Sequence, residues 1–166
     1  MSSKRPSRLT DFTYIGIHAY FLTVCVLSRR PAFQQSDRAT DVINELLRTA
    51  ADYGFAVVAY CVMPDHAHAL LEGTKQDSDF RKFVSMFRQR SGFHFKQTAG
   101  ESLWQDGFYE HVLRSDEAYL PIAAYVLANP IRAGLCETID AYPFSGSDRY
   151  TMQQLTESIQ ALTSRP

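Results

Sequence analysis

Hydrophobic residues recur at two spacings along the chain, and these spacings predict an alternation of strands and helices. Runs rich in β-branched and aromatic residues indicate strands, whereas apolar residues three and four positions apart indicate helices. Phe80, Phe83 and Phe87 have the helical spacing and are expected to face the core. The predicted strands cover residues 14–28, 55–63, 66–73 and 103–114, and the predicted helices cover 41–54, 79–97 and 115–130.

The order of these elements predicts the fold class. Pro64 and Asp65 separate two consecutive strands by a tight turn, which makes the pair an antiparallel hairpin. The whole order is strand, helix, strand, strand, helix, strand, helix, which is typical of α+β domains. We therefore expect a ferredoxin-like or RRM-like antiparallel sheet with helices packed on one face. Residues 151–166 are expected to form a C-terminal tail with the pattern of a helix.

Length and composition fit one globular domain. The chain has 166 residues, of which 45% are hydrophobic, enough to form a sizeable core. It contains no apolar stretch long enough to cross a membrane and no apolar segment of the kind that follows the basic start of a secretory signal. The three cysteines are scattered and predict no disulfide framework, which favours the cytoplasm. A net charge of −1 argues against nonspecific coating of nucleic acid, but it leaves room for a local basic surface.

Two histidines lie one residue apart in the segment CVMPDHAHALLEG, residues 61–73. Side chains alternate along a strand, so His66 and His68 are expected to point to the same face. Two imidazoles on one face can form half of a metal site, although such a pair can also be two ordinary hydrogen-bonded histidines. The neighbouring sequence does not complete a closed zinc site, and an open set of neutral ligands suits a catalytic metal better.

Tyr125 and Asn129 form the second candidate pair. They are four residues apart in a predicted helix and therefore lie one turn apart on the same helical face. The helix is expected to start with Ser115 as its N-cap and to stop at Asn129, before Pro130. The ordinary alternative is a tyrosine at the edge of the core and an asparagine that caps the helix, and the spacing alone leaves both interpretations open.

Three segments of the chain resemble the signature blocks of a known family. They are YCVMPDHAHALLEG, LWQDGFYEHVLR and YVLANPIRAGL. In this order they are similar to the blocks of the single-tyrosine HUH transposases, in which two histidines flank a bulky hydrophobic residue, and in particular to those of the REP-associated tyrosine transposases. The resemblance runs from about Tyr14 to Tyr150, so residues 14–150 are expected to be the transposase domain, preceded by a flexible basic arm at residues 1–13.

The resemblance implies a role for each candidate residue. Tyr125 would be the nucleophile, and His66, His68 and Asn129 would bind a divalent metal, Mg²⁺ or Mn²⁺. The chain departs from the family pattern at two positions. Ala67 replaces the bulky middle residue, and it is expected to point to the opposite face of the sheet. Asp65 stands where the family often has asparagine, and a role in the turn is favoured over a role at the metal.

The implied activity is metal-dependent cleavage of single-stranded DNA and strand transfer through a 5′-phosphotyrosine, at repeats that form hairpins. The protein would act in the bacterial cytoplasm, associated with the nucleoid, as a monomer or a homodimer. Two rival functions stay open. One is a catalytically silent module that binds single-stranded nucleic acid, and the other is a small metallohydrolase that cleaves phosphodiesters without Tyr125.

Basic residues are candidates for DNA contacts, because positive charge follows the phosphates of a single strand and exposed aromatic rings stack on its bases. The ordinary alternative is a solvated helix face. Trp104 and Tyr109 are expected to belong to the core rather than to a stacking surface. The basic candidates are Arg81, Lys82, Arg88, Arg90 and Lys96 in one segment, and Lys4, Arg5 and Arg8 near the N-terminus.

Overall fold

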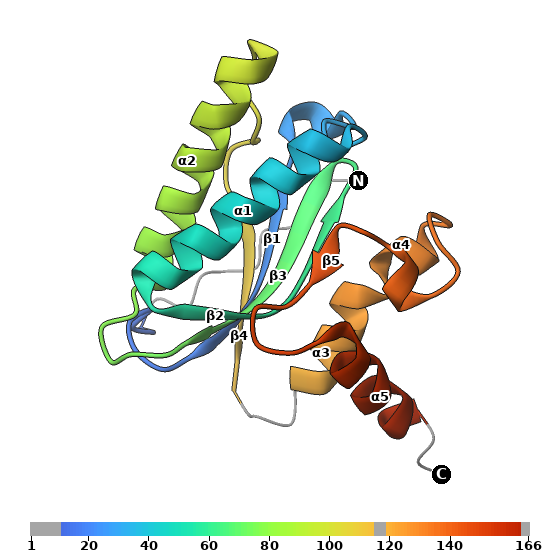
Figure 1. Cartoon of the computed structure of the whole chain (residues 1–166). Coiled ribbons are helices and arrows are strands. Elements are labelled where there is room, and N and C mark those ends of the chain that lie inside the picture. Colours follow the sequence, from blue (N-terminus) through green and yellow to red (C-terminus); the bar gives the residue numbers. More distant parts are fainter. Residues whose placement is uncertain (1–10, 115–118, 164–166) are drawn as a thin grey trace.

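A five-stranded antiparallel sheet lies at the centre of the molecule, with the strand order β4-β1-β3-β2-β5 (Figure 1). The computed structural model describes residues 11–114 and 119–163. Its strands are β1 (Ala19–Cys25), β2 (Phe55–Met63), β3 (His66–Gly73), β4 (Tyr109–Leu113) and β5 (Ser145–Gly146). The predicted α+β class is confirmed, and so is the hairpin, in which Pro64 and Asp65 connect β2 and β3.

Two long helices cover one face of the sheet. They are α1 (Ser36–Tyr53) and α2 (Phe80–Ala99). The predicted apolar stripe of α2 is confirmed, because Phe80, Phe83 and Phe87 are almost completely buried against the sheet and α1. Gly54 ends α1 in the left-handed conformation, as expected for a glycine at this position.

The opposite face carries shorter helices, so the expectation of helices on one face only was too narrow. These helices are α3 (Tyr119–Leu127), α4 (Asn129–Arg132) and α5 (Met152–Thr163). A second apolar cluster joins Val126 of α3 and Leu155 of α5 to Cys61 and Leu70 of the sheet. The physical reason lies in β2, where every residue from 57 to 63 except Tyr60 is buried. A strand with so continuous an apolar run must be covered on both faces.

The boundaries of several elements differ from the predicted ones. The first strand is shorter than 14–28, and a short 3-10 helix, η1 (Leu27–Arg29), follows it. Of the predicted strand at 103–114, only β4 is a strand. Its first part is a loop in which Trp104 makes a single bridge to Val26 and Gly107 has a positive φ of 78°. The predicted N-cap Ser115 lies outside the described residues.

The helix that carries Tyr125 does not stop before Pro130 as expected. Ala128 keeps a helical backbone conformation (φ −84°, ψ −4°), and directly after it the chain continues as α4, with Pro130 in its first turn. A proline is tolerated in this position, because the first backbone N–H groups of a helix have no helical partner anyway. Another short 3-10 helix, η3 (Ile139–Ala141), and β5 then lead to α5.

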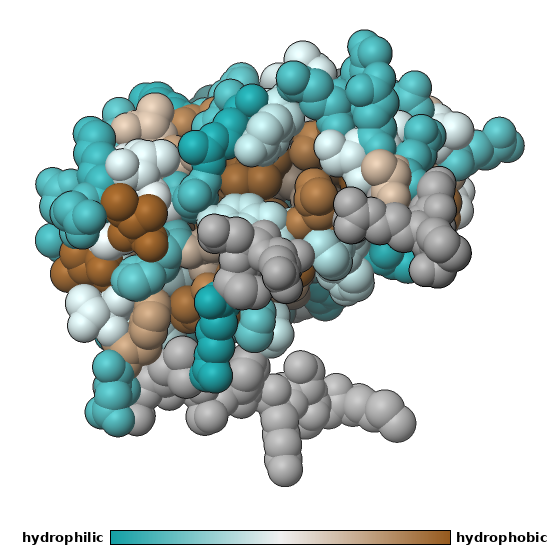
Figure 2. All heavy atoms as spheres, turned by 90° about the horizontal axis from the view of Figure 1, so that it is seen from below, coloured by the Kyte–Doolittle hydropathy of each residue, from teal (hydrophilic) through white to brown (hydrophobic). Residues whose placement is uncertain are grey.

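The surface seen from below carries apolar residues in small groups between hydrophilic ones (Figure 2). Among the described residues, no helix combines the length and the apolar composition that crossing a membrane requires.

Candidate active site

The two histidines of β3 face each other on the side of the sheet that carries α3. Antiparallel pairing places His66 beside Cys25 and His68 beside Thr23 of β1. The two Nε2 atoms lie 3.0 Å apart. Ala67, between them, points to the other face and is buried in the core under α1 and α2, as expected. Two imidazole nitrogens therefore converge on one point at the surface of the sheet.

Each imidazole is held in place through its other ring nitrogen. Nδ1 of His66 lies 2.6 Å from Oδ1 of Asp65, and the second carboxylate oxygen of Asp65 forms a salt bridge of 2.9 Å with Nε of Arg29. A carboxylate only accepts hydrogen bonds, so Nδ1 of His66 carries the proton and its Nε2 presents a lone pair. Nδ1 of His68 lies 2.8 Å from the hydroxyl of Thr23. Such partners orient metal-binding histidines in proteins.

Both histidines favour the neutral form that binds metals. Burial lowers the pKa of His66 from its usual value of 6.5, and the hydrogen bond to Asp65 only partly opposes this effect. Burial, together with the electrostatic influence of the neighbouring His66 imidazole and the positive charge of Arg132, lowers the pKa of His68 to about 3. The site thus consists of neutral nitrogens at physiological pH.

Tyr125 lies next to this pair, on α3. Its ring centre is 6.1 Å from the ring of His68 and 5.8 Å from the ring of Phe21, and half of the residue is exposed. The guanidinium of Arg132 in α4 lies over the ring, 4.3 Å from its centre, and also donates a hydrogen bond of 2.9 Å to the backbone carbonyl of Tyr125. Arg132 follows Tyr125 by seven residues, about two helical turns, and helical hydrogen bonds continue through Ala128, so both side chains lie on the same face.

Asn129 lies on the same helical segment, but its side chain is turned towards the backbone. Its Nδ2 donates hydrogen bonds to the carbonyls of Tyr125 and Val126, at 3.1 and 3.3 Å. In the described part of the chain it makes no hydrogen bond to either histidine. Since the amide nitrogen makes these bonds, the amide oxygen, which is the atom that would bind a cation, is not needed for them. The structure therefore brings together His66, His68 and Tyr125, with Asn129 one turn further along.

The protein offers an open rather than a closed set of metal ligands. Within residues 11–114 and 119–163, no group of three or more histidines, cysteines and acidic residues could hold a metal. Two neutral imidazoles and one amide oxygen would leave several positions of a divalent cation for oxygens from elsewhere. These residues fit a cation that also binds a substrate phosphate, and not a structural zinc ion.

A cavity of about 640 Å³ opens beside Tyr125 and His68. Tyr109 lines it and is 41% exposed, so the expectation that Tyr109 belongs to the core was wrong; it lies on the edge strand β4, and its ring contacts the ring of Phe21. Trp104 does pack against the core, and its Nε1 donates to Ser91. The lining residues are Phe21, Thr23, Cys25, Arg29, His68, Gln105, Asp106, Gly107, Phe108, Tyr109 and Tyr125.

The candidate DNA contacts of α2 have different surroundings. Arg88 is partly buried and donates to the carbonyl of Gln105, and burial lowers the pKa of its guanidinium. Arg90 forms an ion pair with Asp52 of α1, so both arginines already have partners within the protein.

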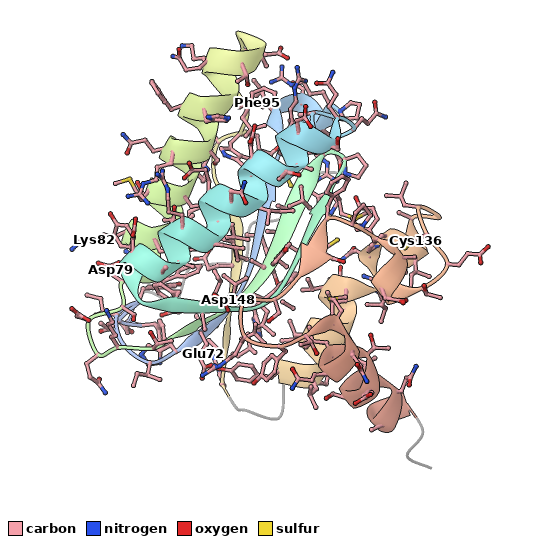
Figure 3. The ribbon with its side chains drawn as sticks, in the orientation of Figure 1. Glu72, Asp79, Lys82, Phe95, Cys136 and Asp148 are labelled. Atoms are coloured by element: carbon pink, nitrogen blue, oxygen red, sulfur yellow. The ribbon has the colours of Figure 1, made fainter. Side chains whose placement is uncertain are left out.

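The other basic residues of α2 reach the solvent. Lys82 lies with Asp79 at the beginning of α2, at 3.6 Å between the charged atoms (Figure 3). Arg81 lies over the ring of Tyr14, and Lys96 is exposed. Lys4, Arg5 and Arg8 lie outside the described residues. A role in DNA binding stays a prediction for all of these residues.

Sequence reasoning missed the residues that support the site. Thr23 and Arg29 lie far from the histidines in sequence, and only the pairing of β1 with β3 brings them close. Asp65 lies in the turn, as expected, and its carboxylate also orients His66, which was not expected. Arg132 lies within the quoted block YVLANPIRAGL, seven residues after Tyr125, and this helical spacing was the one signal that could have pointed to it.

Comparisons with known proteins agree on one family. The family model described as "Transposase IS200 like" matches residues 16–128. The chain is 29% identical over 154 residues to a Haemophilus influenzae protein assigned to the REP-associated tyrosine transposases, and the match covers 84% of each chain. It is 25% identical over 136 residues to the REP-associated tyrosine transposase of Escherichia coli, covering 80% of this chain and 78% of that one.

A solved structure supports the fold. The structure of a REP-associated tyrosine transposase bound to a REP hairpin superposes with a TM-score of 0.68, over 87% of this chain and 82% of that chain. Its sequence identity to this chain is 24%, so this likeness concerns the arrangement of the elements.

Proposed function

The chain belongs to the IS200-like transposase family, and from this premise we propose that it cleaves single-stranded DNA by joining the strand covalently to Tyr125. A second strand end then takes the place of the tyrosine. The observation that carries the proposal is the convergence of two neutral imidazole nitrogens, 3.0 Å apart, beside an exposed tyrosine at the mouth of a cavity.

The proposed step exchanges one phosphodiester for another. The hydroxyl of Tyr125 loses its proton, and its oxygen attacks the phosphorus of the strand. The bond between phosphorus and the 3′-oxygen breaks, and this oxygen takes up a proton. The products are a 5′-phosphotyrosine and a free 3′-OH. In the reverse sense, a 3′-OH from another strand attacks the phosphotyrosine and releases Tyr125, so the number of phosphodiester bonds is conserved and no nucleotide cofactor is needed.

His66, His68 and Asn129 are the residues that would hold a divalent cation, Mg²⁺ or Mn²⁺. When bound there, the cation would polarise a phosphoryl oxygen and offset the negative charge of the departing 3′-oxygen. Asp65 and Thr23 keep the imidazoles fixed, at 2.6 and 2.8 Å from the two Nδ1 atoms, so that little reorganisation is needed when the strand binds.

Arg132 assists the nucleophile. Its guanidinium lies 4.3 Å from the centre of the Tyr125 ring, over the ring face. A guanidinium over a ring face is attracted to the ring, so Arg132 holds the ring of Tyr125 in place. Its hydrogen bond to the carbonyl of Tyr125 also fixes the turn of helix that carries the ring.

The proposed substrate is single-stranded DNA next to a hairpin. Support comes from the relative of similar fold, whose structure contains a REP hairpin. Exposed basic residues of α2, such as Lys82 and Lys96, are the proposed contacts for the DNA backbone. Residues 14–150 would form the catalytic domain, acting as a monomer or a homodimer.

The test is a search for the covalent adduct. The protein is incubated with end-labelled single-stranded oligonucleotides that carry a stem-loop and randomised flanks, with Mg²⁺ or Mn²⁺, and resolved on a denaturing gel. We expect a shifted protein band that the variant Tyr125→Phe does not form. Tyr150→Phe is the matched control, because Tyr150 is also exposed but lies outside the cavity, and it should form the adduct like the parent.

The rival functions give different results. Cleavage without a protein–DNA link, at the same rate in Tyr125→Phe, would indicate a metallohydrolase. Binding of the hairpin that EDTA does not weaken, with neither adduct nor cleavage, would indicate a silent binding module. Either result would contradict the proposed function.

A further inference from the structure

One wall of the cavity beside Tyr125 is a loop held rigidly from behind. The backbone N–H of Gln105 donates to the carbonyl of Cys25 at 3.0 Å, and Arg88 of α2 donates to the carbonyl of Gln105 at 2.6 Å. Trp104 adds a hydrogen bond of 2.9 Å to Ser91. These bonds tie the loop to β1 and α2, so its shape is set before any ligand binds.

A second wall is aromatic. Tyr109 of β4 pairs with Thr23 of β1, and Thr23 pairs with His68 of β3, so the three side chains form a row on one face of the sheet. Tyr109 and His68 are two strands apart, about 10 Å. Phe21 lies beside this row, with its ring centre 6.1 Å from Tyr109 and 5.4 Å from His68. The exposed ring of Tyr109 offers a face on which a flat ring system can stack.

The rim of the cavity carries polar groups, one of which is a negatively charged carboxylate, an unexpected charge at a site for DNA. Gln105 and Asp106 both line it, and Asp106 is exposed. Asp106 interacts electrostatically with Arg88, but within the described ranges its carboxylate makes no hydrogen bond or ion pair. A carboxylate repels phosphates and only accepts hydrogen bonds. At a site for DNA it is therefore suited to the N–H groups of a base and not to the backbone.

Guanine is the base that best matches an exposed carboxylate. On its Watson–Crick edge, which an unpaired base presents freely, two adjacent N–H groups can donate to the two carboxylate oxygens. Adenine and cytosine offer one amino group beside an acceptor, and thymine has no amino group. The cavity volume of about 640 Å³ lies within the range of pockets that hold small molecules.

We propose that this cavity binds one unpaired nucleobase adjacent to the cleaved phosphate, stacked on Tyr109 and Phe21 and read at its edge by Asp106 and Gln105, with guanine preferred. The proposal rests on the proposed function, which places the phosphate at His66 and His68. It assigns the choice of cleavage position to the loop 105–108 and the edge strand β4. It also gives Arg88 a role behind this loop in place of a contact with DNA.

The first measurement is of binding, so that it does not depend on the chemistry. Tyr125→Phe protein is titrated with fluorescent oligonucleotides that differ only at one unpaired position on either side of the phosphate cleaved by the parent, or along the stem-flanking strand if no cleavage occurs. We expect guanine to bind about tenfold more tightly than thymine at one position. In the double variant with Asp106→Asn this preference should disappear. Asp77→Asn, an exposed carboxylate outside the cavity, should keep it.

The second measurement is of adduct formation with Tyr109 variants. Tyr109→Leu should lower the rate about tenfold with every base, because it removes the stacking surface. Tyr109→Phe should react at the rate of the parent, because phenylalanine keeps the stacking ring. If the hydroxyl of Tyr109 had a structural role, Tyr109→Phe would be as slow as Tyr109→Leu. Equal binding of all four bases, or a preference that survives Asp106→Asn, would overturn the proposal even if Tyr125 forms its adduct. If Tyr125→Phe still formed the protein–DNA adduct, the proposed function would be overturned. The binding preference for guanine would still test the pocket, because it is measured without cleavage.

Discussion

At the scale of single residues, the site depends on hydrogen bonds to atoms that do not touch the substrate. Thr23 is the clearest case, because its hydroxyl is the only described partner of Nδ1 of His68. A hydroxyl can donate or accept, so it supports the imidazole in either tautomer. The carboxylate of Asp65 can only accept a hydrogen bond and therefore supports only one tautomer of His66. The partners of the two histidines thus differ chemically, although both lie at hydrogen-bonding distance from an Nδ1 atom.

Thr23→Val should therefore weaken metal binding without unfolding the protein. Valine keeps the shape of threonine but leaves Nδ1 of His68 without its partner. We expect Mn²⁺ to bind about 10- to 100-fold more weakly, as measured by calorimetry. The matched control is Thr40→Val, which removes an exposed hydroxyl of α1 that donates a hydrogen bond to the carbonyl of Ser36, far from the site. Equal Mn²⁺ affinity in the Thr23 variant and the parent would show that this hydroxyl does not support the site.

At the scale of elements, the two long helices end in the same way but in different surroundings. Gly54 after α1 and Gly100 after α2 both have left-handed φ angles, 72° and 76°. A β-carbon at Gly54 would lie 2.9 Å from the hydroxyl oxygen of Ser78, whereas at Gly100 nothing lies within 4 Å. Ser78 cannot easily move, because it is buried and donates to the carbonyl of Gly54.

Gly54→Ala should consequently cost more stability than Gly100→Ala. Gly100→Ala adds only the backbone strain of a left-handed alanine, about 1 kcal/mol. Gly54→Ala adds the displacement of Ser78, for a total of about 2–4 kcal/mol. The free energies of unfolding in urea measure both values. Similar losses in the two variants would mean that the loop at Ser78 yields without cost.

The elements show where sequence reasoning succeeds and where it stops. The bounds of β2 and β3 were predicted correctly. A continuous apolar run lies on each side of the Pro-Asp pair, and this pattern is typical of two strands joined by a tight turn. The segment 103–108 was taken for strand because its residues alternate in polarity. Its backbone instead bonds at single points to the end of β1 and to the residues that follow β1, such as the bridge between Val26 and Trp104. Such tertiary contacts leave no periodic signal in the sequence.

At the scale of the whole molecule, the site is assembled from segments that only the complete sheet brings together. The pair His66 and His68 could be predicted from alternation along one strand, and Tyr125 with Asn129 from the helical repeat. Their mutual distance could not, because it depends on α3 packing across the face of β2 and β3. Thr23 could be predicted even less, since a shift of β1 by one residue would turn it to the opposite face.

Burial of the site also couples it to the stability of the molecule. The pKa of His68 is about 3 in the folded protein and about 6.5 when unfolded. Below pH 6.5 the unfolded chain binds a proton that folded His68 does not. The stabilisation is therefore complete above about pH 6.5 and is lost as the pH falls towards 3. The loss approaches about 1.4 kcal/mol per pH unit, or about 2 kcal/mol between pH 6.5 and pH 5.

His68→Gln should make the free energy of unfolding less sensitive to acid by this amount. Urea unfolding at pH 7, 6, 5 and 4, in EDTA so that no metal competes with protons, gives the slope for the parent and the variant. We expect the parent to lose stability more steeply below pH 6.5 than His68→Gln. His111→Gln is the control, because His111 is exposed on the edge strand β4, and its slope should follow that of the parent. Parallel slopes for the parent and His68→Gln would mean that His68 takes up its proton within the folded protein, and hence that the site opens to water without unfolding.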